Sequence, residues 1–160
     1  MKYTNVALVW AMLTLFSFNS FALSQDVDNG VLSKIERILT KKINPNISLS
    51  IYLPASYYTQ PKECYSVLYV LDGNHFFLNG VAYQSSLAHR AQVPEMIVVG
   101  IEIAPNMRRK LLTTNKEKLR VQLKREIVDY VDKHYFTTEQ RLLFGWEVAG
   151  TFVLELMTDK

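Results

Sequence analysis

The chain has 160 residues, of which 49% are hydrophobic and 21% are charged, and its formal net charge is +3 at pH 7. This composition is that of an ordinary globular protein and excludes collagen, low-complexity and intrinsically disordered chains. The length fits one domain, and the mild charge does not favour nucleic acid as a partner. Cys64 is the only cysteine, which excludes an intrachain disulfide and a cysteine-based zinc site. We expect neither a metal nor a cofactor.

The first 22 residues have the pattern of a signal peptide. An apolar run at residues 6–16 is shorter than the roughly 20 residues that span a bilayer, and it has the length of a signal-peptide hydrophobic region. Ser20 and Ala22 then supply small residues where a signal peptidase cleaves. We expect a signal peptide at 1–22, one domain at 23–160, and a periplasmic or secreted protein without a stable membrane anchor. A single membrane anchor is the alternative, which the short run disfavours.

The segment that follows contains one clear strand. Residues 31–42 fit either a helix or a strand. A turn is expected at 44–46, where a proline lies between two asparagines. Residues 47–53 alternate between apolar and polar side chains, which predicts a half-buried strand, and Pro54 ends it.

Three nearly continuous apolar runs predict strands buried on both faces, as in a parallel sheet. They lie at 65–71, 96–101 and 141–144. Helices are expected at 76–90 and 151–157, and a loop is expected at 103–118. A further helix would bury one apolar face, formed by Leu119, Leu123, Ile127, Val128 and Val131. Strands that alternate with helices predict an α/β fold with a mostly parallel sheet and flanking helices.

The candidate site follows from this arrangement. In open α/β sheets, ligands bind outside the carboxyl ends of the strands. The residues of interest are therefore those at 72–75, the loop after Ile101, and the turn at 145–150.

A basic segment lies beside the candidate site. Within residues 108–125, Glu117 is the only acidic residue. The basic residues are Arg108, Arg109, Lys110, Lys116, Lys118, Arg120, Lys124 and Arg125. The segment is interpreted as a solvated face, or as a surface that attracts an anionic substrate or surface. Aromatic residues do not alternate with these basic residues, so nucleic acid is not an expected partner.

Several segments match the pattern of one family. Residues 51–57 look like its strand and loop VYLP…Y, residues 65–73 look like YPVLYVLDG, and residues 94–101 look like its next strand. Residues 108–114 look like a degraded RxxDLTP, and residues 126–135 and 141–150 look like ELIPYIDKHY and RTLFGHSxGG. The chain thus resembles the putative-esterase family of α/β hydrolases, which includes esterase-D-like and siderophore esterases. The resemblance implies the N-terminal portion of an α/β-hydrolase fold, ending just after the nucleophile-elbow helix.

The nucleophile elbow is where the chain departs from this family. The fold places a serine on a strained turn between a strand and a helix, and small flanking residues let the turn close. Gly145, Ala149 and Gly150 keep those small residues. The nucleophile position, however, holds Glu147, and Trp146 stands where the family has histidine.

Three interpretations of Glu147 follow. The site is catalytically dead, because a carboxylate is a far weaker nucleophile toward an ester carbonyl than a serine activated by histidine. Alternatively, Glu147 is itself a carboxylate nucleophile, as Asp is in the related haloalkane dehalogenases and epoxide hydrolases, although Glu is one methylene longer. Finally, Glu147 is a structural cap at a helix N-terminus, a role that is compatible with a dead site.

The rest of the catalytic machinery is only partly represented. By resemblance, the oxyanion hole would use the backbone N–H groups of Asn74 and Val148, in a loop shaped by Asp72 and Gly73. In this family the acid and the histidine follow the nucleophile along the chain. Here no histidine follows Gly150.

The histidines of the chain therefore precede the elbow. For His134 and His89 we expect a surface or packing role within helices. His75 lies nearer the site, and we expect it to have a structural role in the loop.

These observations predict an exported esterase-family protein, truncated or catalytically degenerate, whose family reaction is carboxylic-ester hydrolysis. The alternative is a secreted, non-catalytic binding protein that keeps the pocket, and a less favoured one is a hydrolase that uses Glu147. The expected partner is a small-molecule ester substrate or ligand.

We predict that the exported protein is processed after Ala22, because a hydrophobic region of signal-peptide length precedes Ser20 and Ala22. N-terminal sequencing of the exported material should begin at Leu23. Exported protein that retains Met1 would contradict this prediction.

Overall fold

The computed structural model describes residues 38–60 and 63–158. The predicted signal peptide at 1–22 and the ambiguous segment up to residue 37 lie outside these described residues, so the export prediction remains a prediction. None of the helices within the described ranges is long and apolar enough to cross a membrane.

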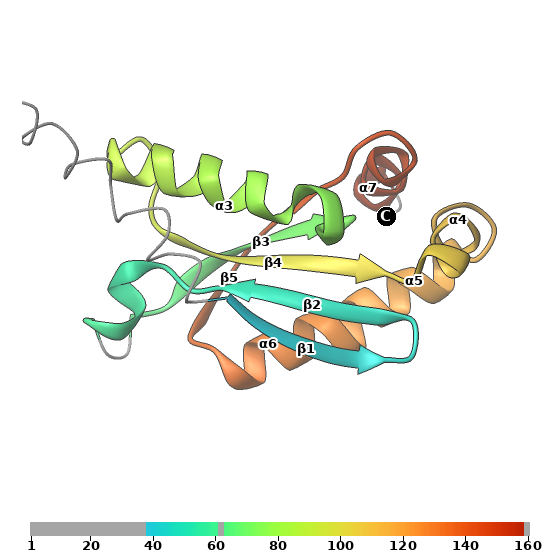
Figure 1. The fold of residues 1–160 in the computed structure, drawn as a ribbon, viewed down its shortest axis with the longest axis horizontal. Helices are drawn as coiled ribbons and strands as arrows, with labels where there is room; N and C mark the ends of the chain where they lie inside the picture. The colour runs from blue at the N-terminus through green and yellow to red at the C-terminus, as the bar shows by residue number, and fades with distance from the viewer. Residues whose placement is uncertain (1–37, 61–62, 159–160) are drawn as a thin grey trace, which may run out of the picture. The chain divides into compact units, whose positions relative to one another are not determined.

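The centre of the domain is a five-stranded sheet in the order β1-β2-β4-β3-β5. The strands are β1 (Ile38–Asn44), β2 (Ile47–Tyr52), β3 (Tyr65–Leu71), β4 (Met96–Ile103) and β5 (Thr137–Phe144). β1 and β2 form an antiparallel hairpin, β2 pairs antiparallel with β4, and β3 pairs parallel with both β4 and β5. Among these five strands β2 runs against the other four, so the sheet is mixed, and the expected α/β class is confirmed (Figure 1).

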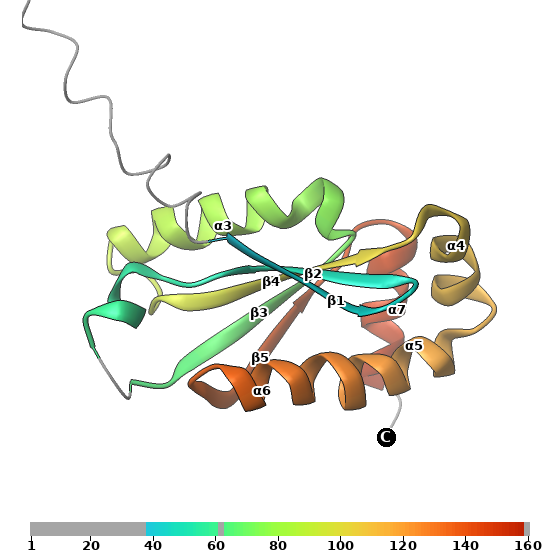
Figure 2. The same cartoon turned by 60° about the horizontal axis from the view of Figure 1, so that its bottom comes forward.

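Helices cover both faces of the sheet (Figures 1 and 2). On one face lies α3 (Gly73–His89), which packs Phe77 and Val81 against Val70 and Val98. The remaining helices share the hydrophobic core of the other face. They are α4 (Pro105–Thr113), α5 (Lys116–Gln122), the π-helical segment η2 (Leu123–Val128), α6 (Asp129–His134) and α7 (Val148–Thr158), and a short 3-10 helix, η1 (Ala55–Tyr58), follows β2.

The strongest patterns in the sequence give the elements that were expected. The alternating segment forms β2, the apolar runs form β3 and β4, and β1 resolves the ambiguous segment as a strand from Ile38 onward. Leu119, Ile127 and Val131 are fully buried on the predicted helix face. α3 begins at Gly73, three residues before the expected start, because the chain turns directly from β3 into the helix at Asp72.

The expectation of a loop at 103–118 is wrong, because α4 and the start of α5 occupy most of this segment. Pro105 stands at the start of α4, a position that tolerates its missing N–H. Leu111 and Leu112 are each only 1% exposed and anchor the helix to the core. The many basic residues around these leucines concealed the apolar side of the helix in the sequence pattern.

The expectation of a short buried strand at 141–144 is also wrong in two respects. β5 begins earlier, at Thr137, with an irregular register opposite Tyr65 to Val67. Within the described residues β5 is the edge of the sheet, so that Leu142 is 39% and Phe144 is 40% exposed. An apolar run indicates burial only where a further element covers the strand.

We predict that Leu119→Ala lowers the free energy of unfolding by about 2–5 kcal/mol, because truncation of this fully buried side chain leaves a cavity in the hydrophobic core. The matched control is Leu154→Ala in α7, whose side chain is 65% exposed and should change stability by about 0.5 kcal/mol or less. Urea unfolding followed by circular dichroism measures both. Equal losses in the two variants would mean that the core assignment is wrong.

Candidate functional site

Two sharp turns form the candidate site at the carboxyl ends of β3 and β5. Asp72 follows β3 with φ 54°, and Glu147 follows β5 with φ 51°. A residue with a side chain rarely adopts this left-handed conformation, which typically stores strain at functional sites. Each turn leads at once into a helix, α3 after Asp72 and α7 after Glu147.

The turn around Glu147 has the steric features predicted for an elbow. A Cβ atom on Gly145 would lie 2.6 Å from the carbonyl carbon and oxygen of Ala149, and one on Gly150 would lie 3.1 Å from the Gly145 oxygen. Ala149 is fully buried. The turn therefore closes only with small residues at these positions, and the Glu147 side chain is left exposed at its apex.

The Glu147 carbonyl also begins the hydrogen bonding of α7. It accepts a hydrogen bond from the Thr151 N–H at 3.0 Å. Val148 is the first residue of α7, and the N–H groups of a first helical turn have no intrahelical acceptor. The Val148 N–H therefore lies at the positive end of the helix dipole, where an oxygen with negative charge is stabilised.

The turn at Asp72 similarly places Asn74 at the start of α3. The Asp72 carbonyl accepts hydrogen bonds from the N–H groups of His75 (2.9 Å) and Phe76 (3.1 Å). Gly73 packs tightly on β4, because a Cβ atom there would lie 2.8 Å from the carbonyl carbon of Gly100. The oxyanion role of the Asn74 and Val148 N–H groups remains a prediction, which these two helix starts make sterically reasonable.

An ion pair that the sequence analysis did not identify fixes the first turn. The Asp72 carboxylate is buried and accepts two hydrogen bonds from the Arg108 guanidinium of α4, at 2.6 and 2.7 Å. The hydrogen bond to Asp72 raises the pKa of Arg108 above its ordinary value, and the negative charges of Asp72 and then Glu147 raise it further, against the opposing effect of partial burial. The positive charge of Arg108 therefore interacts with the carboxylates of both Asp72 and Glu147.

Arg108 was missed because the sequence presents it as one of many basic residues in an expected loop. The one signal that could have identified it is its place at the start of the degraded RxxDLTP segment. Bidentate pairing with a buried carboxylate is a role for which arginine is better suited than lysine.

Two of the three histidines lie where the sequence placed them, and the expected loop position of His75 is wrong. His89 ends α3, at the opposite end of the helix from Asp72. His134 lies in α6, where its Nδ1 is 2.7 Å from the Tyr130 carbonyl oxygen and its ring stacks on Tyr130. His75 is exposed in the first turn of α3, instead of in a loop, and its ring contacts Phe76.

The basic segment is partly neutralised. Arg108 pairs with Asp72, Lys116 pairs with Glu155 of α7 at 2.6 Å, and Arg120 lies 3.6 Å from Glu117. The other basic side chains of the segment are exposed. This arrangement fits the interpretation as a solvated face. Among residues 38–60 and 63–158, no three His, Cys, Asp or Glu side chains come together to hold a metal ion.

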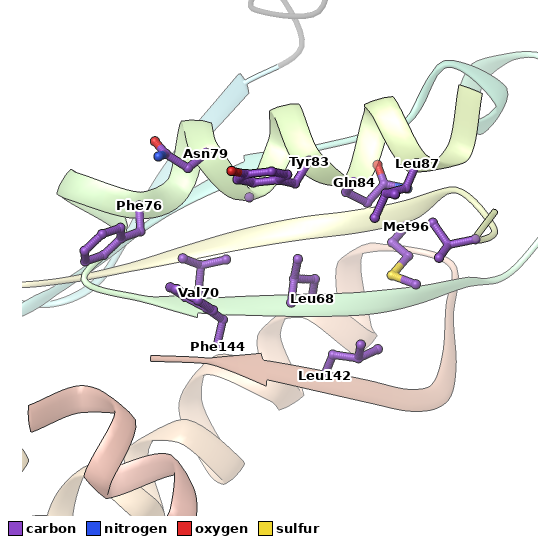
Figure 3. A pocket seen from close by; sticks show the side chains of 12 residues that line it. Leu68, Val70, Phe76, Asn79, Tyr83, Gln84, Leu87, Met96, Leu142 and Phe144 are labelled. Carbon is purple, nitrogen blue, oxygen red and sulfur yellow. The ribbon is translucent and has the colours of Figure 1, made fainter. Parts of the chain in front are cut away.

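An apolar groove of about 410 Å³ runs beside the site, between α3 and the strands β3 and β5 (Figure 3). At one end the rings of Phe76 and Phe144 are in contact, with centroids 5.8 Å apart. Gly145 of the elbow follows Phe144 directly. The lining residues are Leu68, Val70, Phe76, Asn79, Gly80, Tyr83, Gln84, Leu87, Val93, Met96, Leu142 and Phe144.

Comparison with known proteins identifies the family. The family described as Putative esterase matches residues 40–160, and the chain belongs to it. A comparison with curated proteins gives no match.

The solved structures extend the comparison to the fold. An IroE-like serine hydrolase from Shewanella oneidensis is 21% identical with a TM-score of 0.67, and the match covers 74% of this chain and 45% of that one. The BES protein from Bacillus cereus is 21% identical with a TM-score of 0.60, covering 87% and 60%. A ferulic acid esterase is 15% identical with a TM-score of 0.54, covering 72% and 50%. The chain thus spans about half the length of these structures, whose likeness confirms the α/β-hydrolase type of fold.

We predict that Arg108→Gln lowers the free energy of unfolding by roughly 1–3 kcal/mol, because the buried Asp72 carboxylate loses its charged partner. The range is below that for a fully buried pair because the Arg108 side chain is 37% exposed. Arg109→Gln, the neighbouring exposed arginine, is the control. In a double-mutant cycle with Asp72→Asn, the two losses should be strongly non-additive, whereas additive losses would argue against the pair.

Proposed function

We propose that this chain is an exported member of the esterase family whose nucleophile elbow is catalytically degenerate. The observation that carries the proposal is Glu147, which occupies the strained apex of the elbow at φ 51° where the family has serine. The chain keeps the strained turn, its small flanking residues and the helix that follows it. A carboxylate replaces the serine hydroxyl that would attack an ester.

The chemistry of a carboxylate supports loss of the family reaction. Serine hydrolases form an acyl-enzyme by attack of a hydroxyl whose proton passes to a histidine. The Glu147 carboxylate is a poor nucleophile toward an ester carbonyl, and attack would give an anhydride in place of an acyl-serine. Arg108, held on Asp72, lies near enough for the negative charge of Glu147 to raise the pKa of its guanidinium, so the carboxylate at the elbow lies close to a fixed positive charge.

The alternative within this proposal is a secreted binding protein. The N–H groups of Asn74 and Val148 are backbone groups and survive the replacement of serine, so an oxygen of an ester or a carboxylate can still be bound. In this alternative the chain recognises the same class of small molecule as its family and releases it unchanged.

A hydrolase that uses Glu147 is the less favoured alternative. The exposed carboxylate at a strained turn is the observation in its favour. Its extra methylene, relative to aspartate, displaces the oxygen from the geometry that such a turn imposes on a nucleophile.

We predict that the purified chain does not hydrolyse a short-chain aryl ester above the background rate, and that Glu147→Ser alone does not restore robust turnover. A serine there would need a general base, and His89 and His134 lie in helical positions that the fold holds elsewhere. The measurement is release of the aryl alcohol by wild type, Glu147→Ser and Glu147→Gln.

The variants distinguish a carboxylate nucleophile, a serine activated by His75 and a degenerate site. Robust wild-type turnover that is lost in Glu147→Gln would establish the carboxylate nucleophile and overturn the proposal. Turnover only in Glu147→Ser, lost again in Glu147→Ser/His75→Ala, would identify His75 as a base that reaches the elbow. Background rates in all of them, with folding confirmed by circular dichroism, support the degenerate site.

A further inference from the structure

Exposed apolar side chains are concentrated on β5 and α7. Among the described residues, twelve large apolar side chains are exposed, and seven of them lie between Phe136 and Met157. These seven are Phe136, Leu142, Phe144, Trp146, Val148, Leu154 and Met157. Single exposed apolar side chains are normal on a protein surface, whereas a concentration of them on consecutive elements marks an interaction surface.

The backbone of β5 is also open along one side. β5 pairs only with β3 and is the edge of the sheet within the described residues. The Phe136 carbonyl accepts a hydrogen bond from the Tyr65 N–H at 2.9 Å, so Tyr65 and every second residue after it in β3 direct their backbone groups toward β5. Arg141 is paired with Val67. The N–H and C=O groups of Arg141 therefore point away from β3, where a further strand can bind them.

The charges on β5 fit a second copy of the same strand in one register. Glu139 and Arg141 lie two residues apart and so share one face of the strand. In an antiparallel pair with its two-fold axis at Gln140, Glu139 of each copy lies opposite Arg141 of the other. An axis at Glu139 or at Arg141 would instead place two like charges opposite each other. Charge complementarity therefore selects the axis at Gln140.

The same register pairs the exposed side chains on the other face of β5. Phe136, which directly precedes β5, is 51% exposed and would lie opposite Phe144 of the second copy, which is 40% exposed. Leu142 would lie opposite Thr138 of the second copy. Pairs of aromatic side chains across neighbouring strands stabilise antiparallel pairing. One register thus satisfies both the charged and the aromatic side chains.

Arg141 can make the new ion pair without losing its present contacts. Its guanidinium donates to the Asp132 carboxylate of α6 at 2.6 Å and to the Glu139 carbonyl at 2.8 Å. The side chain is still 33% exposed, and a guanidinium has five N–H donors. Charged residues on an edge strand usually oppose pairing with another chain. Here the two opposite charges oppose other registers and favour this one.

We propose that two copies of this chain associate by antiparallel pairing of their β5 strands about a two-fold axis at Gln140. The pairing joins the five-stranded sheets of the two copies into one continuous sheet. It forms an isologous interface, in which each copy contributes the same surface. The inference is independent of whether the elbow acts on an ester.

Disulfide trapping in a Cys64→Ser background tests the register, because Cys64 is an exposed free cysteine. Gln140 lies opposite itself at the axis, in a non-hydrogen-bonded pair whose Cα atoms are about 4.5 Å apart, which suits a disulfide. Gln140→Cys should therefore give a covalent dimer under mild oxidation. Thr138→Cys is the matched control, because its two copies would be about 14 Å apart along the strands.

A double variant makes this test independent of any one substitution. Thr138→Cys alone should stay monomeric on a denaturing gel, whereas Thr138→Cys/Leu142→Cys should cross-link, because these two positions lie opposite each other in the proposed register. Circular dichroism confirms that each variant is folded. A covalent dimer formed by Thr138→Cys alone would show a different register and overturn the proposal.

Sedimentation equilibrium tests the charge pairing. Glu139→Arg places like charges opposite each other at both symmetry-related positions and should weaken dimerisation about tenfold. Glu139→Arg/Arg141→Glu reverses both charges and should recover part of this loss. Glu117→Arg changes the net charge by the same amount on α5, away from β5, and should dimerise like wild type.

The remaining outcomes are also decisive. A wild-type chain that sediments as a monomer at every accessible concentration would overturn the proposal. A dimer that neither cross-links through Gln140→Cys nor weakens in Glu139→Arg would place the interface on another surface, with the same consequence. Ester hydrolysis by wild type would refute the degenerate elbow and leave the dimer standing, so failures of the two proposals are distinguishable.

Discussion

The structure depends on two left-handed residues that turn strands directly into helices. Asp72 and Glu147 have φ values of 54° and 51°, and each ends one of two adjacent parallel strands. Because β3 and β5 run in the same direction, both turns occur at the same edge of the sheet. Parallel pairing therefore brings the starts of α3 and α7 to the same edge of the sheet, at the carboxyl ends of the strands where open α/β sheets bind their ligands.

Close backbone packing keeps these turns in place. Gly73 lies against Gly100, and a side chain on Gly100 would collide with Phe77 of α3. At the other turn, Gly145 lies against the Ala149 carbonyl. A left-handed residue persists only where its surroundings hold it. At both turns a nearby glycine packs against main-chain atoms that leave no room for a side chain.

One arginine, Arg108, places a positive charge between the carboxylates of the two turns. Arg108 extends from α4 to the buried Asp72 carboxylate and also experiences the charge of Glu147. A family member with serine at the elbow would have one carboxylate fewer beside this arginine. Glu147 therefore changes the charge at the elbow as well as its side chain.

The sequence alone determined the α/β class, the strands at 65–71 and 96–101, the buried helix face at Leu119 and the small residues of the elbow. Each of these depends on local periodicity or on steric needs within a few residues, which a sequence displays directly. Tertiary structure alone decided that α4 exists and that its Arg108 reaches Asp72, 36 residues away in the chain. It also decided that Leu142 and Phe144 are exposed, because β5 is the edge of the sheet within the described residues and burial depends on which elements lie alongside a strand.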